Sequence, residues 1–167
     1  MCCCLRSTTC AYSLLQVAAL ANLHACGVVH RDVKPENFLL SPNGHLVLAD
    51  FGLSWAGQDK NANLYGLGMN FFTGTSGYRA PEMVIAEAVG YDCLVDVWSL
   101  GITLLEAYIG KRLHIFDVSD RNKLVEAMIT RDIPLHRIHD AQLQDLLRKV
   151  NSLLLRRKRN PDDMPPR

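Results

Sequence analysis

The sequence lacks a long hydrophobic run and a strong charge of either sign, and each absence removes a class of protein. No stretch of about eighteen consecutive apolar residues occurs, so the sequence predicts no membrane-spanning helix. A net charge of +1 gives no reason to expect binding along a nucleic acid. With 49% apolar residues in a chain of 167, the composition is typical of one soluble globular domain.

The sequence also lacks the marks of a disulfide framework or a zinc site. Three of the six cysteines, Cys2, Cys3 and Cys4, are adjacent in the chain. This arrangement favours free thiols in a reducing compartment over a set of disulfides. No Cys/His spacing is typical of zinc ligands. Palmitoylation of the three adjacent cysteines is an alternative, but no basic cluster or amphipathic anchor beside them supports it.

The most informative stretch, residues 30–52, has a turn signal near its middle. Two apolar runs, residues 38–40 and 45–48, flank the pair Asn43-Gly44. Both residues of that pair tolerate a positive φ, as a tight β-turn requires. The pattern predicts a β-hairpin whose two ends meet.

Three oxygen-bearing side chains should converge at the open end of this hairpin. Asn37 enters the hairpin and Asp50 leaves it, while Asp32 lies on a segment that Pro35 keeps out of a regular helix. Carboxylate and amide oxygens suit a hard cation such as Mg²⁺, which usually also binds water and phosphate oxygens. The geometry alone therefore predicts a metal or acid–base site of unspecified purpose.

The residue identities match a known family in order and spacing. The matching motifs are His30-Arg31-Asp32, Asn37, Asp50-Phe51-Gly52, Ala80-Pro81-Glu82 and residues 96–101. Together they resemble the catalytic loop and magnesium motif of eukaryotic-type Ser/Thr protein kinases. The resemblance covers residues 11–160 and implies the C-terminal lobe of the kinase fold, mainly α-helical with a small β-hairpin. Residues 1–10 are expected to be a ragged N-terminal segment, and residues 161–167 a disordered tail.

The resemblance implies chemical roles for the polar residues of this stretch. Asp32 would act as the general base or orient the substrate hydroxyl, and Lys34 would stabilise charge on the transferred phosphoryl group. Asn37 and Asp50 would hold Mg²⁺ on the phosphates of ATP. For Lys34 the plainer interpretation is a solvated loop lysine.

Two more residues are implied for the nucleotide site. Leu39 would lie beneath the adenine, and Glu36 would contribute to the same site. Packing within the hairpin is an alternative interpretation of Leu39, and it is compatible with the first.

Residues 53–79 form a long connection whose sequence fits no helix of useful length, so it should be functional or disordered. The resemblance makes it the activation segment, whose end docks the protein substrate. Its hydroxyl-bearing residues are Tyr65, Thr73, Thr75, Ser76 and Tyr78. Thr75 would bond to the catalytic Asp and Lys, and Thr73 is the favoured phosphorylation site. Phe71 stands where some kinase groups have an activating Thr, so activation by phosphorylation stays open.

Several residues would act as structural supports. His30 and Phe51 would pack together in a spine, and Arg31 would pair with a phosphorylated residue of the activation segment. Asp96, inside an otherwise apolar helix, would accept hydrogen bonds from the backbone of the His-Arg-Asp turn. Glu82 would form a buried ion pair with a late arginine. The favoured partner is Arg159, with Arg156 and Arg157 as alternatives.

The hydrophobic periodicity predicts the remaining elements. They are helices over residues 11–25, 82–88, 92–108, 121–130 and from 140 to about 154, and a short buried strand over residues 28–29. Gly27 should cap the first helix. The apolar start of that helix could be mistaken for a signal peptide, but Gln16 and Asn22 interrupt it.

The sequence contains no Gly-x-Gly-x-x-Gly loop and no Val-Ala-x-Lys strand, the parts of a kinase small lobe that clamp the phosphates. We therefore expect this chain alone to transfer phosphate barely or not at all. A fragment of an active Ser/Thr kinase is the favoured hypothesis. The alternatives are a catalytically inert scaffold or decoy that binds protein partners, and an enzyme completed by a separate polypeptide.

The expected partners are a protein substrate and, where a small lobe is supplied, ATP. The expected location is the cytoplasm, with the nucleus as an alternative because residues 156–159 form a basic run. The end of the activation segment leans weakly toward the AGC-like or calcium/calmodulin-kinase-like groups.

Overall fold

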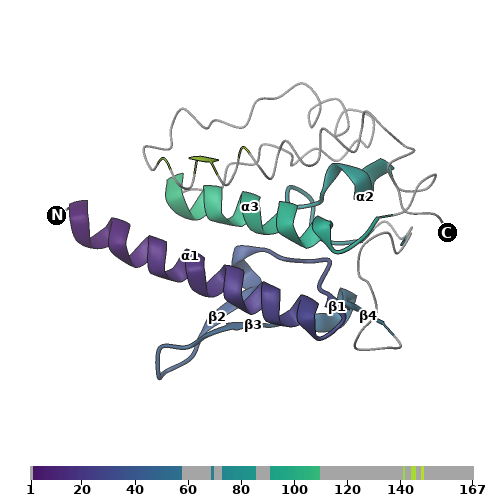
Figure 1. Ribbon diagram of the computed structural model, residues 1–167, viewed down its shortest axis with the longest axis horizontal. Helices are drawn as coiled ribbons and strands as arrows, with labels where there is room; N and C mark the ends of the chain where they lie inside the picture. Colours follow the sequence, from purple (N-terminus) through teal and green to yellow (C-terminus); the bar gives the residue numbers. More distant parts are fainter. Residues whose placement is uncertain are drawn as a thin grey trace.

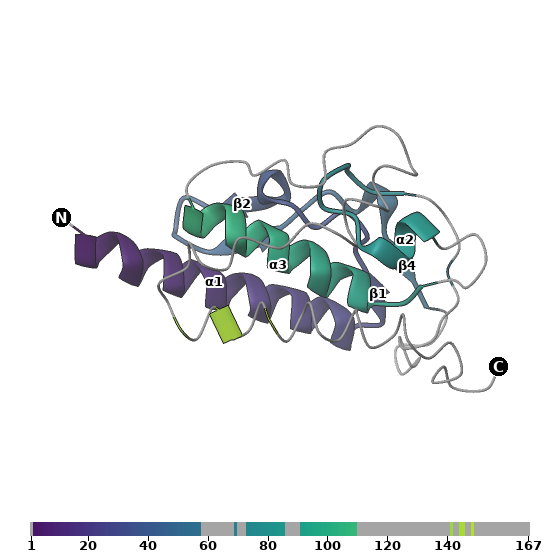
Figure 2. The same ribbon diagram turned by 90° about the horizontal axis from the view of Figure 1, so that it is seen from above.

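The computed structural model describes residues 2–57, 69, 73–85, 91–109, 141, 144, 145 and 148. Within this part, helices α1 (Cys2–Ala25) and α3 (Leu94–Ile109) lie side by side, with a hairpin packed against α1 (Figures 1 and 2). The short elements are α2 (Pro81–Ile85), the 3₁₀ turns η1 (Pro35–Asn37) and η2 (Phe51–Leu53), and strands β1 (Val28–Val29), β2 (Phe38–Leu40), β3 (Leu46–Leu48) and β4 (Trp55–Ala56). No helix in the described residues is both long enough and apolar enough to cross a bilayer.

Helix α1 begins at Cys2 rather than at residue 11, so residues 2–10 are helical and not the expected ragged segment. No proline or glycine interrupts these residues, so the helix continues toward the N-terminus although Cys, Ser and Thr are weak helix formers. The predicted cap at Gly27 is confirmed. Gly27 has φ +77°, and its N–H donates to the carbonyl of His24 at 2.9 Å.

The predicted hairpin is also confirmed. Strands β2 and β3 pair antiparallel, with Leu39 opposite Val47. Gly44 adopts φ +84° in the turn, and Ser41 N donates to the carbonyl of His45 at 2.8 Å. Strand β3 begins at Leu46 rather than at residue 45.

The predicted strand at residues 28–29 is present, and Val29 is fully buried. Its partner is β4, which pairs with it antiparallel and lies within the stretch predicted as a connection. A two-residue strand is too short to show the alternation by which strands are recognised in a sequence.

Helix α3 was predicted over residues 92–108 and spans Leu94–Ile109. Its all-round apolar character has a structural reason, because two hydrophobic clusters pack on different sides of it. Trp98 and Ile102 belong to one cluster, which also contains Val29, while Leu100 and Leu104 belong to the other. The helix is therefore the central element of the described core.

Several predictions fall partly or wholly outside the described residues. Helix α2 spans Pro81–Ile85 within the predicted residues 82–88, of which 86–88 are not described. Of the helix predicted from residue 140, positions 141, 144, 145 and 148 are described and are helical. Residues 121–130 and 156–167, and with them the proposed Glu82–Arg159 ion pair, lie outside the described part.

Candidate active site

The turn that follows β1 is hydrogen-bonded to helix α3 through the carboxylate of Asp96. Asp96 is fully buried, and its two side-chain oxygens accept hydrogen bonds from the backbone N–H groups of His30 and Arg31, each at 2.7 Å. These are the bonds that the family resemblance implied for Asp96. Arg31 has φ +66°, which is uncommon for a residue with a side chain. The paired bonds to Asp96 hold the backbone in that conformation.

The next residue, Asp32, forms a three-membered cluster with Lys34 and Thr75. Lys34 Nζ donates to Asp32 Oδ2 at 2.8 Å and to Thr75 Oγ1 at 2.7 Å. Thr75 donates to Asp32 Oδ1 twice, from its backbone N at 2.7 Å and from its hydroxyl at 2.6 Å. The contact predicted between Thr75 and the Asp–Lys pair is therefore present.

The cluster keeps Asp32 ionised. Burial alone would raise the pKa of this carboxyl group. The hydrogen bonds from Lys34 and Thr75, together with the positive charge of Lys34, outweigh burial and hold the pKa of Asp32 below its ordinary value. A carboxylate kept in the charged, acceptor form is suited to receive a hydroxyl group.

The approach of the activation segment to the catalytic turn requires a glycine at position 74. A Cβ atom there would lie 2.6 Å from the carbonyl oxygen of Arg31, and Gly74 has φ +84°. Arg79 helps to hold this loop by donating from Nε to the carbonyl of Thr73 at 2.9 Å. Only a residue without a side chain lets Thr75 reach Asp32.

Asn37 and Asp50 lie at the open end of the hairpin, as the turn signal predicted. Ala49 N donates to the carbonyl of Asn37 at 2.8 Å, so the two ends of the hairpin meet next to Asp50. Asn37 Nδ2 donates to the carbonyl of Asp32 at 2.8 Å, which leaves its Oδ1 as the atom available to a cation. Asp50 is exposed, and within the described residues its carboxylate accepts one hydrogen bond, from Gly52 N at 3.4 Å.

An amide oxygen and an exposed carboxylate fit Mg²⁺ held jointly by protein and phosphate oxygens. Among the described residues, no group of three or more His, Cys, Asp or Glu side chains could hold a metal by itself. The donor set thus suits a cation that also binds a ligand.

The predicted supporting contact between His30 and Phe51 is present. Their ring centroids lie 5.1 Å apart in an edge-to-face arrangement. Arg31 Nε donates to the carbonyl of Leu53 at 2.6 Å, so its side chain spans the turn after the Asp-Phe-Gly motif. Phe51 itself is 49% exposed.

The residues implied for adenine do not form a closed site in the described part of the chain. Leu39 is 52% exposed, which contradicts the alternative interpretation of its side chain as hairpin core, and Glu36 is also exposed. The period of two explains the exposure of Leu39. On the other face of the hairpin, Leu48 belongs to the cluster that also contains Leu20 of α1 and Leu100 of α3, and Phe38 packs against that cluster.

Tyr78 shows a contact that the sequence analysis missed. Its hydroxyl donates to Glu106 on α3 at 2.6 Å, and its carbonyl accepts from Ser99 at 2.8 Å. Burial, followed by the hydrogen bond to Glu106 and the charge of Glu106, raises the pKa of the Tyr78 phenol above its ordinary value. No local pattern pairs residues so far apart in the chain.

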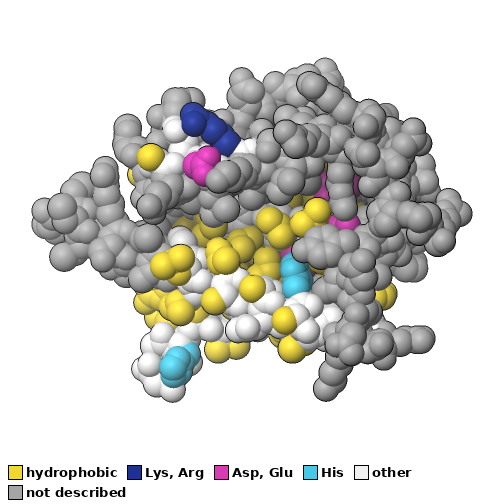
Figure 3. Space-filling model, in the orientation of Figure 1, with side chains coloured by type: hydrophobic (Ala, Val, Ile, Leu, Met, Phe, Trp, Pro, Cys, Tyr) yellow, Lys and Arg dark blue, Asp and Glu magenta, His cyan; other side chains and the backbone are white. Residues whose placement is uncertain are grey.

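His24 was missed as well. Its Nε2 lies 2.8 Å from Asp96 Oδ2, the carboxylate that fastens the catalytic turn. The only signal in the sequence is a polar residue on the same face of α1 as Leu20 and Ala21. Figure 3 shows apolar side chains gathered across the middle of the face on which α1 and α3 lie.

Comparisons with known proteins agree with this geometry. The family model described as "Protein kinase domain" matches residues 5–158. The chain is 50% identical to "Serine/threonine-protein kinase sck2" of Schizosaccharomyces pombe over 93 residues, 55% of this chain and 13% of that protein.

Two other relatives cover more of the chain. "Ribosomal protein S6 kinase alpha-6" of Homo sapiens is 36% identical over 143 residues, 86% of this chain and 17% of that protein. "Protein kinase 3" of Dictyostelium discoideum is 36% identical over 139 residues, 80% of this chain and 15% of that protein. The matched chain thus spans 13–17% of the lengths of these three curated relatives.

Proposed function

The chain belongs to the protein kinase family, as a serine/threonine-type transferase domain, and we propose that it carries the large-lobe half of the active site that phosphorylates protein hydroxyl groups. The observation that supports this most strongly is the cluster in which Lys34 and Thr75 bond to each other and to Asp32. Such a cluster orients one carboxylate and one cation toward the same reacting group.

In the proposed reaction the substrate is a Ser or Thr hydroxyl on a protein. The hydroxyl oxygen forms a bond to the γ-phosphorus of ATP while the bond to the β-phosphate oxygen breaks, and the hydroxyl proton passes to Asp32. Lys34 Nζ, 2.8 Å from Asp32 Oδ2, would stabilise negative charge on the transferred phosphoryl group. Thr75 holds Asp32 in place through Oδ1. Oδ2, which also accepts from Lys34 Nζ at 2.8 Å and from Asn37 Nδ2 at 3.4 Å, would face the hydroxyl.

Asn37 and Asp50 are the residues that would hold Mg²⁺. A bound Mg²⁺ would neutralise charge on the phosphate oxygens. The bond from Asn37 Nδ2 to the carbonyl of Asp32 couples this amide to the catalytic turn. The positions of the hydroxyl group and of the phosphates would therefore be set by one connected piece of backbone.

We also propose that these 167 residues alone transfer phosphate barely or not at all. Phosphoryl transfer depends on positioning and charge stabilisation, and the sequence holds neither a Gly-rich loop nor a strand lysine for the phosphates. Each loss of about 1.4 kcal/mol of stabilisation lowers the rate tenfold. Leu39 and Val47, an exposed cross-strand pair, and the half-exposed Phe51 are apolar side chains that a second lobe over the nucleotide could cover.

The test is transfer of radiolabel from ATP to a peptide mixture by the natural full-length protein. Asp32→Asn should lower the rate at least a hundredfold, because general-base catalysis contributes about 10²–10⁴. Asp145→Asn, which alters an exposed carboxylate, is the matched control and should keep the rate. Label should be found on Ser or Thr after acid hydrolysis of the products.

Two outcomes would contradict the proposal. One is label transfer by the full-length protein that Asp32→Asn leaves unchanged. The other is no transfer at all by the full-length protein, which would favour a scaffold that binds protein partners.

A further inference from the structure

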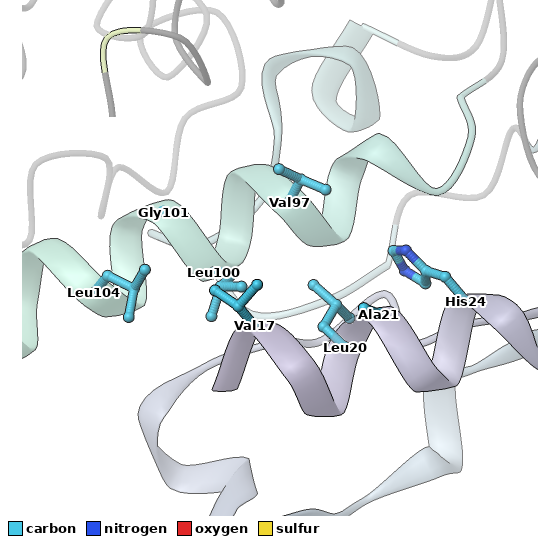
Figure 4. Close-up of a pocket in the computed structure, with 8 residues that line it drawn as sticks. All are labelled: Val17, Leu20, Ala21, His24, Val97, Leu100, Gly101 and Leu104. Carbon is cyan, nitrogen blue, oxygen red and sulfur yellow. The ribbon is translucent and has the colours of Figure 1, made fainter. Parts of the chain in front are cut away.

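The hydroxyl groups of helix α3 are hidden from any modifying enzyme. Ser99 and Thr103 are buried, and each donates to a backbone carbonyl, Ser99 to that of Tyr78 at 2.8 Å and Thr103 to that of Ser99 at 2.9 Å. Among the described residues, those that line the cavity of about 200 Å³ between α1 and α3 carry no hydroxyl group (Figure 4). An enzyme that modifies a hydroxyl group would need a more accessible one.

The turn between β2 and β3 presents such a group on Ser41, at the end of the hairpin that projects away from α1 and α3 (Figure 1). Gly44 N donates to the carbonyl of Ser41 at 2.9 Å, the bond that closes a β-turn. The other turn residues, 42–45, are all exposed, and Ser41 is partly exposed. The turn has open space around it, because a Cβ atom at position 44 would meet no atom of the described residues within 4 Å.

The residue after Ser41 indicates which kind of enzyme would modify it. Among the serines and threonines of these 167 residues, only Ser41 is followed by a proline, Pro42. Proline has a fixed φ and no backbone N–H, so an enzyme can select it through a contact that other residues do not fit. The residues before Ser41, 38–40, are all apolar and offer nothing to an enzyme that selects basic side chains there.

The hydroxyl group of Ser41 also helps to close the turn. It donates to Asn43 Oδ1 at 2.6 Å, lies 3.0 Å from the carbonyl oxygen of His45, and accepts from His45 N at 3.0 Å. A phosphate ester at this oxygen would have no proton to donate, and would bring a charge of about −1.5 to −2 next to both acceptor oxygens. Phosphorylation of Ser41 would therefore open the turn.

We propose that Ser41 is a phosphorylation site for a proline-directed protein kinase, and that the phosphate loosens the β2–β3 hairpin from its turn. In this step Ser41 Oγ forms a bond to the γ-phosphorus of ATP, the bond to the β-phosphate oxygen breaks, ADP leaves, and the hydroxyl proton passes to the base of the modifying kinase. The opposite end of the hairpin carries Asn37 and Asp50, so the modification would act on the proposed Mg²⁺ site. The modification itself does not depend on the proposed function, because a second enzyme performs it.

The test uses the full-length protein with Asp32→Asn, which removes its own proposed transfer activity. A purified mitogen-activated protein kinase, which selects proline after the acceptor, should transfer label from ATP to the peptide that contains residues 38–48. Ser41→Ala should abolish this label, and Pro42→Ala, which keeps the hydroxyl group, should slow its incorporation at least about tenfold. A kinase that selects arginine before the acceptor is the matched control and should leave this peptide unlabelled.

Hydrogen exchange followed by mass spectrometry measures the effect on the hairpin. In the phosphorylated protein, residues 38–48 should exchange about fivefold faster than in the unmodified protein, whereas residues 94–109 of α3 keep their rate. Ser41→Ala removes the donor without adding charge, so it should raise the exchange rate of residues 38–48 by less than phosphorylation does.

Three results would overturn the proposal. The first is an absence of label on residues 38–48 of the folded protein; label on a synthetic peptide of the same residues would then show that the turn is inaccessible. The second is incorporation into Pro42→Ala at the rate seen with proline. The third is an unchanged exchange rate in residues 38–48 after phosphorylation.

Discussion

The two halves of the candidate site differ in how completely this chain assembles them. In one half, Asp32 is buried and accepts hydrogen bonds from Lys34 and Thr75. The backbone N–H of the preceding residue, Arg31, donates to the buried Asp96. The half around Asp50 is open, with one hydrogen bond to its carboxylate within the described residues. The described residues thus assemble the part proposed to bind the protein hydroxyl, and leave the part proposed to bind the nucleotide open to further groups.

The largest expected difference between the halves concerns their carboxylates. Asp96→Asn should lower the free energy of unfolding by about 3–5 kcal/mol, because the new amide would turn a donor toward three existing donors in a buried site. Asp50→Asn, at an exposed site whose positive φ asparagine tolerates, should change it by at most about 0.5 kcal/mol. Urea unfolding of both variants measures the two values. Equal losses would contradict the contrast.

A pair of glycines sharpens the comparison. Gly74 and Gly44 have the same φ of +84°, but a Cβ atom at position 74 would meet Arg31 O at 2.6 Å, whereas a Cβ atom at position 44 meets nothing within 4 Å. Gly74→Ala should therefore cost about 1–3 kcal/mol more than Gly44→Ala, because only the first adds overlap to the shared backbone strain. Urea unfolding at one pH gives this difference directly, and a difference near zero would show that the loop relaxes without cost.

The Tyr78–Glu106 hydrogen bond should make the free energy of unfolding depend on pH in the alkaline range. Tyr78→Phe leaves Glu106 without this donor and should cost about 1–3 kcal/mol at pH 8. The folded protein raises the pKa of Tyr78, so it holds the proton more tightly than the unfolded chain does. The stabilisation is therefore complete below about pH 10 and falls as the pH rises above that value.

The check is the difference in unfolding free energy between the wild type and Tyr78→Phe, measured at pH 8 and at pH 11. The difference should shrink at the higher pH. A constant difference would mean that the phenol has the same pKa in the folded and unfolded states.

The smallest effect is expected on the open face of the hairpin. Leu39→Ser should change the unfolding free energy by at most about 0.5 kcal/mol, because the side chain is half-exposed and packs in neither cluster. The matched change Leu48→Ser, on the buried face of the same hairpin, should cost at least about 2 kcal/mol. Thermal melts of both variants measure the two losses of stability. A large loss of stability in Leu39→Ser would show that the open face of the hairpin is already packed.

What the sequence predicted well is what local patterns encode. The hairpin depends on Asn43-Gly44 and two apolar runs, and the cap at Gly27 depends on one residue next to a helical stripe. The contact of Asp96 with the catalytic turn was predicted from the family resemblance and from the cost of an isolated carboxylate in an apolar helix.

The features that the sequence did not predict depend mostly on contacts between distant parts of the chain. His24 meets Asp96, and Tyr78 meets Glu106, only after the chain has folded, and neither pair has a spacing that marks it in the sequence. Strand β4 exists because β1 lies beside it, and its own two residues show no strand pattern. The start of α1 at Cys2 was missed because weak helix formers were interpreted as a break in the helix.

The most direct test of the contrast between the halves is phosphate transfer by the isolated 167-residue chain, with Asp32→Asn as the control. We predict no transfer of radiolabel from ATP above that control, although the hydrogen bonds between Asp32, Lys34 and Thr75 are all present. Transfer by the isolated chain that Asp32→Asn abolishes would show that these residues also hold the nucleotide productively, and would contradict the account.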